Sequence, residues 1–529
     1  MNNKTLTKKV LKKYADSEYI YPLRKYSLFI DHADSKKCAR ISAVIERELE
    51  SGISEDCIEN LIKGIKGLSN LQDSEIHLFL FALTRHIFTL LKNDLILPDK
   101  AVEILSKACE LDMKSLYQAL SCVHKILMSK DTHHYRISDD ATREHIRRRI
   151  YSFAEKHRIS QIESARIYSD TKALNREKAL GRSFYPILFA LTISGFSLIW
   201  HFWGFICGIF LLFPLFEATR MILLYFISRF TRAGYVPRIK GEKIPPNAKT
   251  TVVITSLIDK TNIPKLLKNL EDYYNRNSDD GAVFGILGDL PESDLEYDEN
   301  DEAIIDLAKK GIEELNGKYG EHFCLFIRER RYSPDREKFF GWDRKRGAII
   351  DLCAFLEFEK NDGFVHLSFP KAFRSKYLIT LDFDTLLTHN DVKRMVFAML
   401  HPDNAPVIEN GVVTKGHGIM QPRVVLCPES ACATPFCLTL FGSGGNNNYR
   451  IPLFDFYQSL FGKGIFCGKG IIDVSAFNKV IPPAFAKERI LSHDILEGAY
   501  LRCAYLSDTV LLDSCPKNPI SYYKRLHRW

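Results

Sequence analysis

A long stretch without charged side chains interrupts an otherwise mixed pattern of hydrophobic and polar residues. Residues 183–216 contain no Asp, Glu, Lys or Arg, and the apolar character continues to residue 228. A helix needs about 20 apolar residues to cross a bilayer. The pattern therefore predicts a transmembrane hairpin over residues 183–230, with spans at about 184–202 and 205–228. A long buried helical hairpin in a soluble protein is the alternative.

Basic residues flank both ends of this hairpin. Lys178 and Arg182 precede it, and Arg229 and Arg232 follow it. Because positively charged flanks remain on the cytoplasmic side, both ends are expected in the cytosol, which requires an even number of spans. Within the second span, Glu217 and Arg220 are three residues apart on one helical face, where they can pair.

The chain before the hairpin, residues 1–182, reads as a helical cytosolic region. Segments such as "CIENLIKGIKGL" and "EIHLFLFALTRHIFTLL" carry apolar residues at helical spacing. We find no catalytic constellation in this region.

After residue 245 the pattern changes to short apolar strands that alternate with amphipathic helices. "TTVVITSL", "AVFGILGD", "HFCLFIR" and "YLITLDFDT" read as strands with helical segments between them. This alternation predicts an α/β domain over residues 245–529, built on a doubly wound, mainly parallel sheet. Such sheets bind ligands outside the carboxyl ends of their strands, where Asp289, Asp382 and Asp384 are expected.

Asp382 and Asp384 form a D-x-D pair at the end of a hydrophobic strand. Residues two apart point to one side of a strand, so both carboxylates can face one divalent cation. Mg²⁺ or Mn²⁺ is the expected cofactor, because both ions bind oxygen ligands and share them with diphosphates. The alternative is a solvated turn in which Asp384 caps the next helix.

Two further segments carry candidate chemistry. "RKRG" opens a helix at the end of a basic segment, and Lys345 and Arg346 there favour an anion such as a diphosphate. Asp494 follows His493 before another helix, and helix capping is the alternative to a catalytic role for it. The basic and aromatic terminus "YYKRLHRW" suits a membrane surface, or a sugar platform with a phosphate clamp.

Composition narrows the choice of partners. The net charge is +8 and no long single-sign tail is present, so phosphate or a membrane surface is expected rather than nucleic acid. Thirteen cysteines are spread along the chain without a zinc-type spacing, which favours buried reduced thiols.

The order of these motifs resembles that of membrane-bound β-glycan synthases of the GT-A type, which have D, D-x-D, (E/H)D and Q/R-x-x-R-W in series. The similarity is greater to the glycosyltransferase region of cyclic β-1,2-glucan synthases, glycosyltransferase family 84. Its motifs are matched by "GWDRKRG", "LDFDT", "IMQPRV", "FCGKGIIDVSAF", "ILSHDILEG" and "KRLHRW". The resemblance covers roughly residues 135–529.

This resemblance implies an inverting transfer of glucose from UDP-glucose to a β-1,2-glucan acceptor, at a bacterial-type inner membrane. Asp494 would be the general base on the acceptor hydroxyl, and Asp289 would contact the uridine. Asp382 and Asp384 would hold the nucleotide and its metal. The residues implied at the diphosphate and the acceptor sugar are Lys345, Arg346, Arg525, Arg528 and Trp529.

The sequence departs from the family in one main respect. Related synthases continue beyond the R-x-x-R-W motif, whereas this sequence stops at Trp529. We therefore expect a truncated relative, with a separate C-terminal half of the synthase as a candidate partner. A β-glycosyltransferase of another linkage and a catalytically silent membrane-bound fragment remain as alternatives.

Overall fold

The computed structural model describes residues 3–15, 17, 23, 39–50, 57–68, 71, 73–131, 134–170, 177–230, 235–334, 336–371, 373–441, 458, 461–485 and 493–528. The chain divides into two compact units. One contains residues 1–136 and 143–174, and the other contains residues 137–142 and 175–529.

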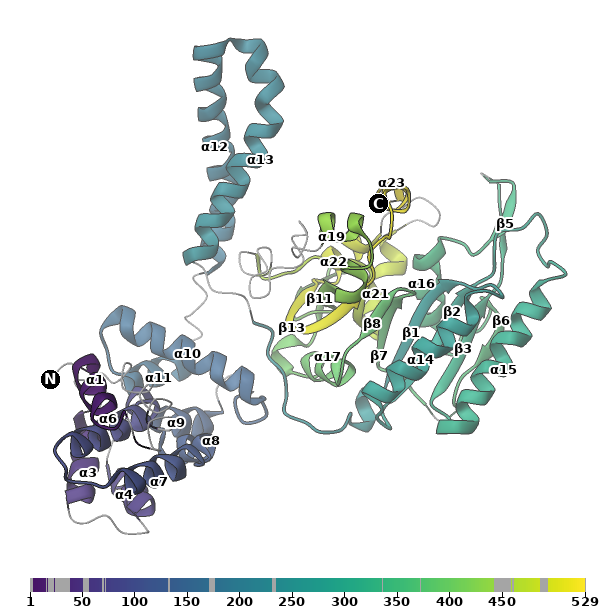
Figure 1. The fold of residues 1–529 in the computed structure, drawn as a ribbon. Coiled ribbons are helices and arrows are strands. Elements are labelled where there is room, and N and C mark those ends of the chain that lie inside the picture. The colour runs from purple at the N-terminus through teal and green to yellow at the C-terminus, as the bar shows by residue number, and fades with distance from the viewer. Residues whose placement is uncertain are drawn as a thin grey trace. The chain divides into compact units, whose positions relative to one another are not determined.

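The first unit is helical and is drawn in purple and blue (Figure 1). Its helices bury the apolar positions of the sequence pattern in one main core, which includes Leu61, Leu83 and Phe88. The helices of this part of the chain are α1 (Asn3–Lys13), α3 (Ala39–Glu50), α4 (Cys57–Lys66), α5 (Asp73–His77), α6 (Phe79–Lys92), α7 (Pro98–Cys109), α8 (Met113–Leu120), α9 (Cys122–Lys130), α10 (Asp140–His157) and α11 (Gln161–Asp170).

Two long apolar helices follow, α12 (Glu177–Trp203) and α13 (Phe205–Phe230), which pack against each other (Figure 1). Segments Ser183–Trp203 and Phe205–Phe226 within them have mean hydropathies of 1.5 and 1.8, and only 17% and 6% of their most apolar windows is buried. By length and composition both helices could cross a membrane, and their exposure disfavours the buried-hairpin alternative. Arg220 pairs with Glu217 at 2.6 Å, as the spacing predicted.

A nine-stranded sheet forms the centre of the second unit, in the order β6-β3-β2-β1-β7-β12-β11-β13-β8. Strands β3, β2, β1, β7, β11 and β13 run in one direction, which agrees with the predicted mainly parallel sheet. The antiparallel strands β6, β12 and β8 were not predicted. The strands are β1 (Thr250–Leu257), β2 (Ala282–Asp289), β3 (Phe323–Arg328), β6 (Phe364–Ser368), β7 (Tyr377–Asp382), β8 (Thr385–Leu387), β11 (Ile419–Leu426), β12 (Gly470–Asp473) and β13 (Ala504–Asp513).

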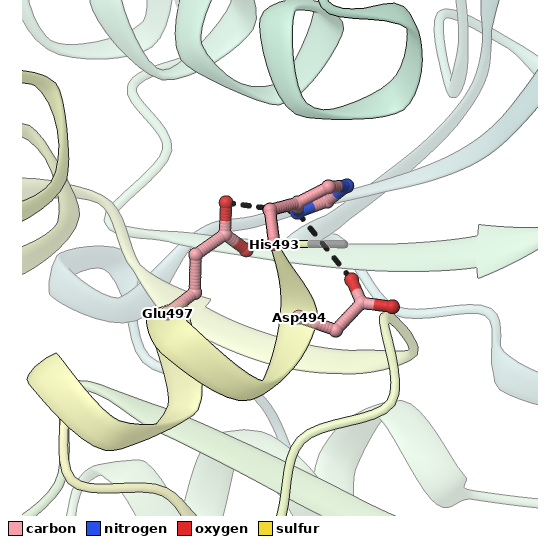
Figure 2. Close-up of side chains that lie close together, drawn as sticks. All are labelled: His493, Asp494 and Glu497. Atoms are coloured by element: carbon pink, nitrogen blue, oxygen red, sulfur yellow. Dashed lines mark ion pairs between the residues drawn. The ribbon is translucent and has the colours of Figure 1, made fainter. Parts of the chain in front are cut away.

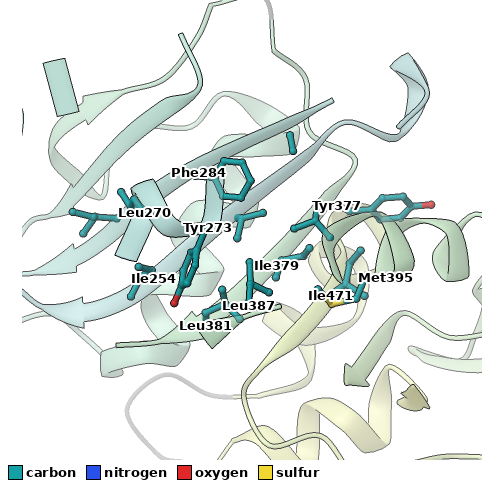
Figure 3. Packing of buried hydrophobic residues seen from close by; sticks show 14 of the residues in the cluster. Ile254, Leu270, Tyr273, Phe284, Tyr377, Ile379, Leu381, Leu387, Met395 and Ile471 are labelled. Carbon is teal, nitrogen blue, oxygen red and sulfur yellow. The ribbon is translucent and has the colours of Figure 1, made fainter. Parts of the chain in front are cut away.

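Helices cover both faces of this sheet. Alternate strand residues divide between two cores: Ile254 and Phe284 pack with α14, α15 and α17 (Figure 3), whereas Val253 and Val283 pack with α16 and α21. This alternation is the signature of a sheet that is buried on both sides. The helices are α14 (Ile263–Asn277), α15 (Asp301–Tyr319), α16 (Arg344–Phe358), α17 (Asp391–Met399) and α21 (Val474–Ala484).

Smaller elements complete the unit. Two small antiparallel ribbons are β4 (Arg331–Ser333) with β5 (Lys338–Phe340) and β9 (Val407–Glu409) with β10 (Val412–Lys415). The remaining helices are α18 (Pro428–Ala431), α19 (Pro435–Phe441), α22 (Asp494–Tyr500) and α23 (Pro519–Arg528), with 3-10 turns at Pro246–Ala248 and Pro402–Asn404.

A buried ion pair fixes the loop that leaves the carboxyl end of β2. Arg330 Nη2 donates to Asp301 Oδ1 at 2.9 Å, and both side chains are almost completely buried. Arg330 also donates to the carbonyl oxygens of Pro291 and Glu296, so one guanidinium ties the loop to the start of α15. The pair therefore helps to hold the edge of the sheet at which ligands are expected.

Replacing Asp301 with Ala should lower the free energy of unfolding by about 3–5 kcal/mol, because it leaves a buried guanidinium without its counter-charge. Urea unfolding of the purified protein, followed by intrinsic fluorescence, measures this loss. Asp306→Ala is the matched control, since Asp306 lies exposed on the same helix. Equal stability of the two variants would show that the pair contributes nothing.

Candidate active site

Charged side chains gather at the carboxyl ends of the central parallel strands. Asp289 ends β2, Arg328 ends β3 opposite it, and Asp382 ends β7. The register pairs Leu257 of β1 with Asp289 and Thr255 with Asp382, so both carboxylates lie on the same edge of the sheet. The sequence predicted this edge as the functional one.

Asp289 is engaged in a buried ion pair. Arg328 Nη1 donates to Asp289 Oδ1 at 2.9 Å, and the same guanidinium donates to Asp351 and to the carbonyl oxygen of Trp342. Burial raises the pKa of Asp289, while Arg328 opposes that rise. Gly341 packs against this carboxylate so closely that a Cβ there would lie 2.7 Å from it. Sequence reasoning missed Arg328, whose signal is a charged residue at the end of an apolar strand.

Asp382 is held between two ammonium groups. Lys345 Nζ lies 2.5 Å from Oδ1, and Lys469 Nζ lies 3.1 Å from Oδ2. Burial alone would raise the pKa of Asp382, but the two lysines outweigh it and lower the pKa to about 2. Asp382 is therefore ionised at neutral pH.

Lys469 connects Asp382, at the end of β7, to a second carboxylate at the end of β13. Its side chain is 5% exposed, and its ammonium group also pairs with Asp513 at the end of β13. Asp513 in turn accepts a hydrogen bond from Thr385 Oγ1 at 2.7 Å. Neither Lys469 nor Asp513 was predicted as a site residue, although Lys469 lies in the quoted motif "FCGKGIIDVSAF", which is part of a glycine-rich segment over residues 461–477.

Asp384 lies beside Arg525, another of the predicted site residues. Arg525 Nη1 is 3.4 Å from Asp384 Oδ2 and 3.2 Å from the carbonyl oxygen of Ser514. Burial raises the pKa of Asp384, Asp513 and Asp382 add to the rise, and Lys469 and Arg525 oppose it. The predicted residues Arg528 and Trp529 have side chains outside the described part of the chain.

Lys345 and Arg346 diverge at the start of α16. Lys345 reaches Asp382 and donates to the carbonyl oxygen of Gly468 at 2.6 Å. Arg346 is buried, pairs with Asp343 at 3.0 Å and donates to the carbonyl oxygen of Phe485. Of these two residues, Lys345 is the one that faces the charged cluster, and a diphosphate contact of Arg346 stays a prediction.

Asp494 lies against Gly468, the residue that Lys345 also contacts. Gly468 has φ +82°, and a Cβ at this position would lie 2.9 Å from Asp494 Oδ1. Asp494 is the first residue of α22, and the residue at the N-cap position is His493, whose side chain makes no capping hydrogen bond. Asp494 Oδ1 is buried and accepts no hydrogen bond from the described residues. The capping alternative is therefore not supported.

His493, Asp494 and Glu497 form a compact group beside this site (Figure 2). One ligand atom from each residue lies within 4.8 Å of the others, which is close enough to hold a metal ion. At the predicted metal site the two carboxylates differ. Both oxygens of Asp382 face ammonium groups, so Asp384 is the carboxylate that is better suited to a divalent cation.

Sequence comparison relates this chain to a glucan synthase. Over 316 residues it is 31% identical to the cyclic beta-(1,2)-glucan synthase NdvB of Rhizobium meliloti (strain 1021). The alignment covers 58% of this chain and 11% of that protein, so the chain matches only a small part of its relative's length. No protein-family model matches the chain. The relationship agrees with the resemblance that the order of motifs indicated.

Replacing Lys469 with Met should lower the free energy of unfolding by about 3–5 kcal/mol, because Asp513 then loses its buried counter-charge. The pH dependence gives a second readout. Because the pKa of Asp382 is lowered on folding, its contribution is present above about pH 3.9 and is lost as the pH falls to about 2. This acid-induced loss should become shallower in the variant.

Urea unfolding at neutral and acidic pH measures both effects. Lys463→Met is the control, since Lys463 is an exposed lysine of the same glycine-rich segment. If Lys469→Met and Lys463→Met have the same free energy of unfolding, the ion pairs of Lys469 with β7 and β13 do not stabilise the fold.

Proposed function

We propose that the chain is a membrane-anchored inverting glycosyltransferase that transfers glucose from UDP-glucose to a β-1,2-glucan acceptor. The observation that carries this proposal is the meeting of two charged groups at Gly468. Its carbonyl oxygen accepts from Lys345, which pairs with Asp382, and its Cα lies against the carboxylate of Asp494. A candidate base thus adjoins a candidate anion site.

The proposed reaction is a direct displacement at the anomeric carbon. Asp494 takes the proton of the acceptor hydroxyl, and that oxygen forms a bond to the anomeric carbon of glucose. The bond from this carbon to the diphosphate oxygen breaks, and UDP leaves with the electron pair. Lys345 and Arg525 stabilise the negative charge of the departing diphosphate.

A divalent cation, Mg²⁺ or Mn²⁺, is part of this proposal. Asp384 would hold it together with diphosphate oxygens, and when bound it would supply further positive charge at the leaving group. Asp289, with Arg328, would lie on the uridine side of the donor. Arg346, Arg528 and Trp529 are kept as proposed contributors to donor and acceptor binding.

The membrane and the fold family belong to the same proposal. The exposed apolar helices α12 and α13 would span the bilayer as a hairpin with basic flanks in the cytosol. The sheet would be of the GT-A type, with its carboxyl edge as the cytosolic site. Relationship to a glucan synthase supports both assignments, and it supports a glucan as the acceptor.

UDP release from UDP-glucose tests the reaction directly. Asp494→Asn should reduce the rate at least about 100-fold, because the amide cannot accept the proton, while UDP binding is retained. Asp384→Asn should instead weaken the Mg²⁺- or Mn²⁺-dependent binding of UDP. Membranes that carry the full chain are assayed with each metal, and UDP affinity is measured separately by calorimetry.

Asp362→Asn is the control, since Asp362 lies exposed in a turn. Normal turnover of the Asp494 variant would exclude this carboxylate as the base. A folded chain that binds UDP but releases none from UDP-glucose would favour the alternative, in which the chain acts only as part of a larger glucan synthase.

Gly468→Ala offers a second test of the same geometry. The added methyl group would displace the carboxylate of Asp494, and we expect turnover to fall about 100-fold without loss of the fold. Gly411→Ala is the matched control, because Gly411 also has a positive φ (+75°) but nothing lies within 4 Å of its added Cβ. Equal turnover of the two variants would show that the position of the Asp494 carboxylate does not affect the reaction.

A further inference from the structure

Glu497 carries a buried carboxylate that the proposed reaction does not use. Its side chain is 1% exposed, and neither oxygen accepts a well-aligned hydrogen bond from the described residues. Burying an isolated carboxylate costs several kcal/mol unless a positive charge lies beside it. The position of Glu497 therefore calls for a cationic neighbour.

His493 is that neighbour. Its Nδ1 lies 3.0 Å from Glu497 Oε1 and 3.5 Å from Asp494 Oδ1, and Figure 2 shows the imidazole between the two carboxylates. His493 is the N-cap residue of the short helix α22 and Glu497 lies in its first turn, so the four-residue spacing brings the two side chains to one side of the helix start.

The charges around His493 favour its protonated form. Burial lowers the pKa of His493, but Glu497 and then Asp494 outweigh burial and raise the pKa above its usual value. Lys345, on α16, is the charged group that opposes them from outside the helix. An imidazolium here balances Glu497 and attracts the carboxylate of Asp494.

We propose that Glu497 and His493 are positioning residues for Asp494: Glu497 keeps His493 charged, and the imidazolium holds the Asp494 carboxylate against Gly468. This inference rests on the proposed function, in which Asp494 is the base. It gives a function to the Glu497 carboxylate, whose burial would otherwise only lower the stability of the fold.

The close approach of α22 to its surroundings supports a fixed arrangement. A Cβ at Gly498, next to Glu497, would lie 2.8 Å from the Cβ of Phe466. Phe466 is itself buried and belongs to the segment that leads to Gly468. Helix α22 and the segment that carries Gly468 are thus packed together. The ion pair therefore acts on an Asp494 carboxylate that is already held in a fixed position.

The same three side chains could instead hold a metal ion. In that case Asp494 would donate its oxygen to the metal and would not be available to accept a proton. Metal binding is therefore a competing outcome of the experiment.

The first measurement is the pH profile of UDP release by the full chain and its variants. A histidine that must be charged supports activity until the pH rises through its pKa, so Glu497→Gln should move the high-pH limb to lower pH. We expect kcat to fall about tenfold in Glu497→Gln and about 100-fold in His493→Gln, with KM and UDP affinity within twofold of wild type.

A merely structural role would lower thermal stability and UDP affinity together and would leave the pH limb in place. That result would overturn the proposal. Glu409→Gln is the matched control, because Glu409 is an exposed glutamate remote from this cluster in the sequence, and it should change none of these quantities.

The second measurement does not depend on activity. Hydrogen–deuterium exchange at the imidazole carbon of His493, followed by mass spectrometry of the full chain, reports the pKa of this residue. The wild-type value should lie above that of an ordinary histidine and should fall in Glu497→Gln. An unchanged value would overturn the proposal even if UDP release is observed, whereas absent UDP release with the expected shift would contradict the proposed function alone.

Metal analysis of the purified full chain completes the test. A stoichiometric transition metal that survives chelation in wild type but is lost in His493→Gln and Glu497→Gln would assign the cluster as a metal site. That finding would overturn the positioning role.

Discussion

The candidate site depends on one partly buried charge balance, in which Asp382 is held between Lys345 and Lys469. The two lysines come from the start of α16 and from the segment before β12, while Asp382 ends β7. Lys469 reaches on to Asp513 at the end of β13, which accepts from Thr385 at the start of β8. A continuous series of ionic and polar contacts therefore links β7, β8 and β13. Removing any one of these charges leaves the partner charge without its counter-charge.

The position of Asp494 follows from the same balance. Lys345 reaches Asp382 and at the same time donates to Gly468, so it fixes the backbone of the glycine-rich segment. Gly468 can approach a carboxylate closely because it has no side chain, and its positive φ would strain other residues. The anion-binding and proton-accepting parts of the proposed site are thus set by one lysine and one glycine.

The sequence allowed much of this arrangement to be predicted, because its signals are local. A β-branched run marked β1, a short apolar run marked β7, and aspartates at strand ends marked the candidate functional edge of the sheet. Asp384 and Arg525 were each predicted as site residues, but the contact between them was not predicted. Arg346 was predicted beside Lys345, but in this structure it pairs with Asp343, and its contact with a diphosphate stays a prediction.

The contacts that were missed depend on the order of strands rather than on spacing along the chain. Lys469 meets Asp382 because the antiparallel strand β12 inserts beside β7, and Asp513 joins them through β11 and β13. An alternating strand and helix pattern predicts parallel neighbours and carries no signal for such an insertion. Glu497 and His493 had a local signal, their four-residue spacing, but its meaning depends on burial that the sequence does not specify.

The charges at this edge also bear on how a sugar nucleotide would enter. Lys345, Lys469 and Arg525 carry three positive charges, and Asp382, Asp384 and Asp513 carry three negative charges when ionised, so the cluster is close to neutral. A diphosphate that entered alone would add negative charge to a partly buried site, where such charge is costly. A diphosphate that enters with a divalent cation adds much less. In the proposed function, this balance of side-chain charges would favour a metal–nucleotide complex over the bare nucleotide, whichever sugar the nucleotide carries.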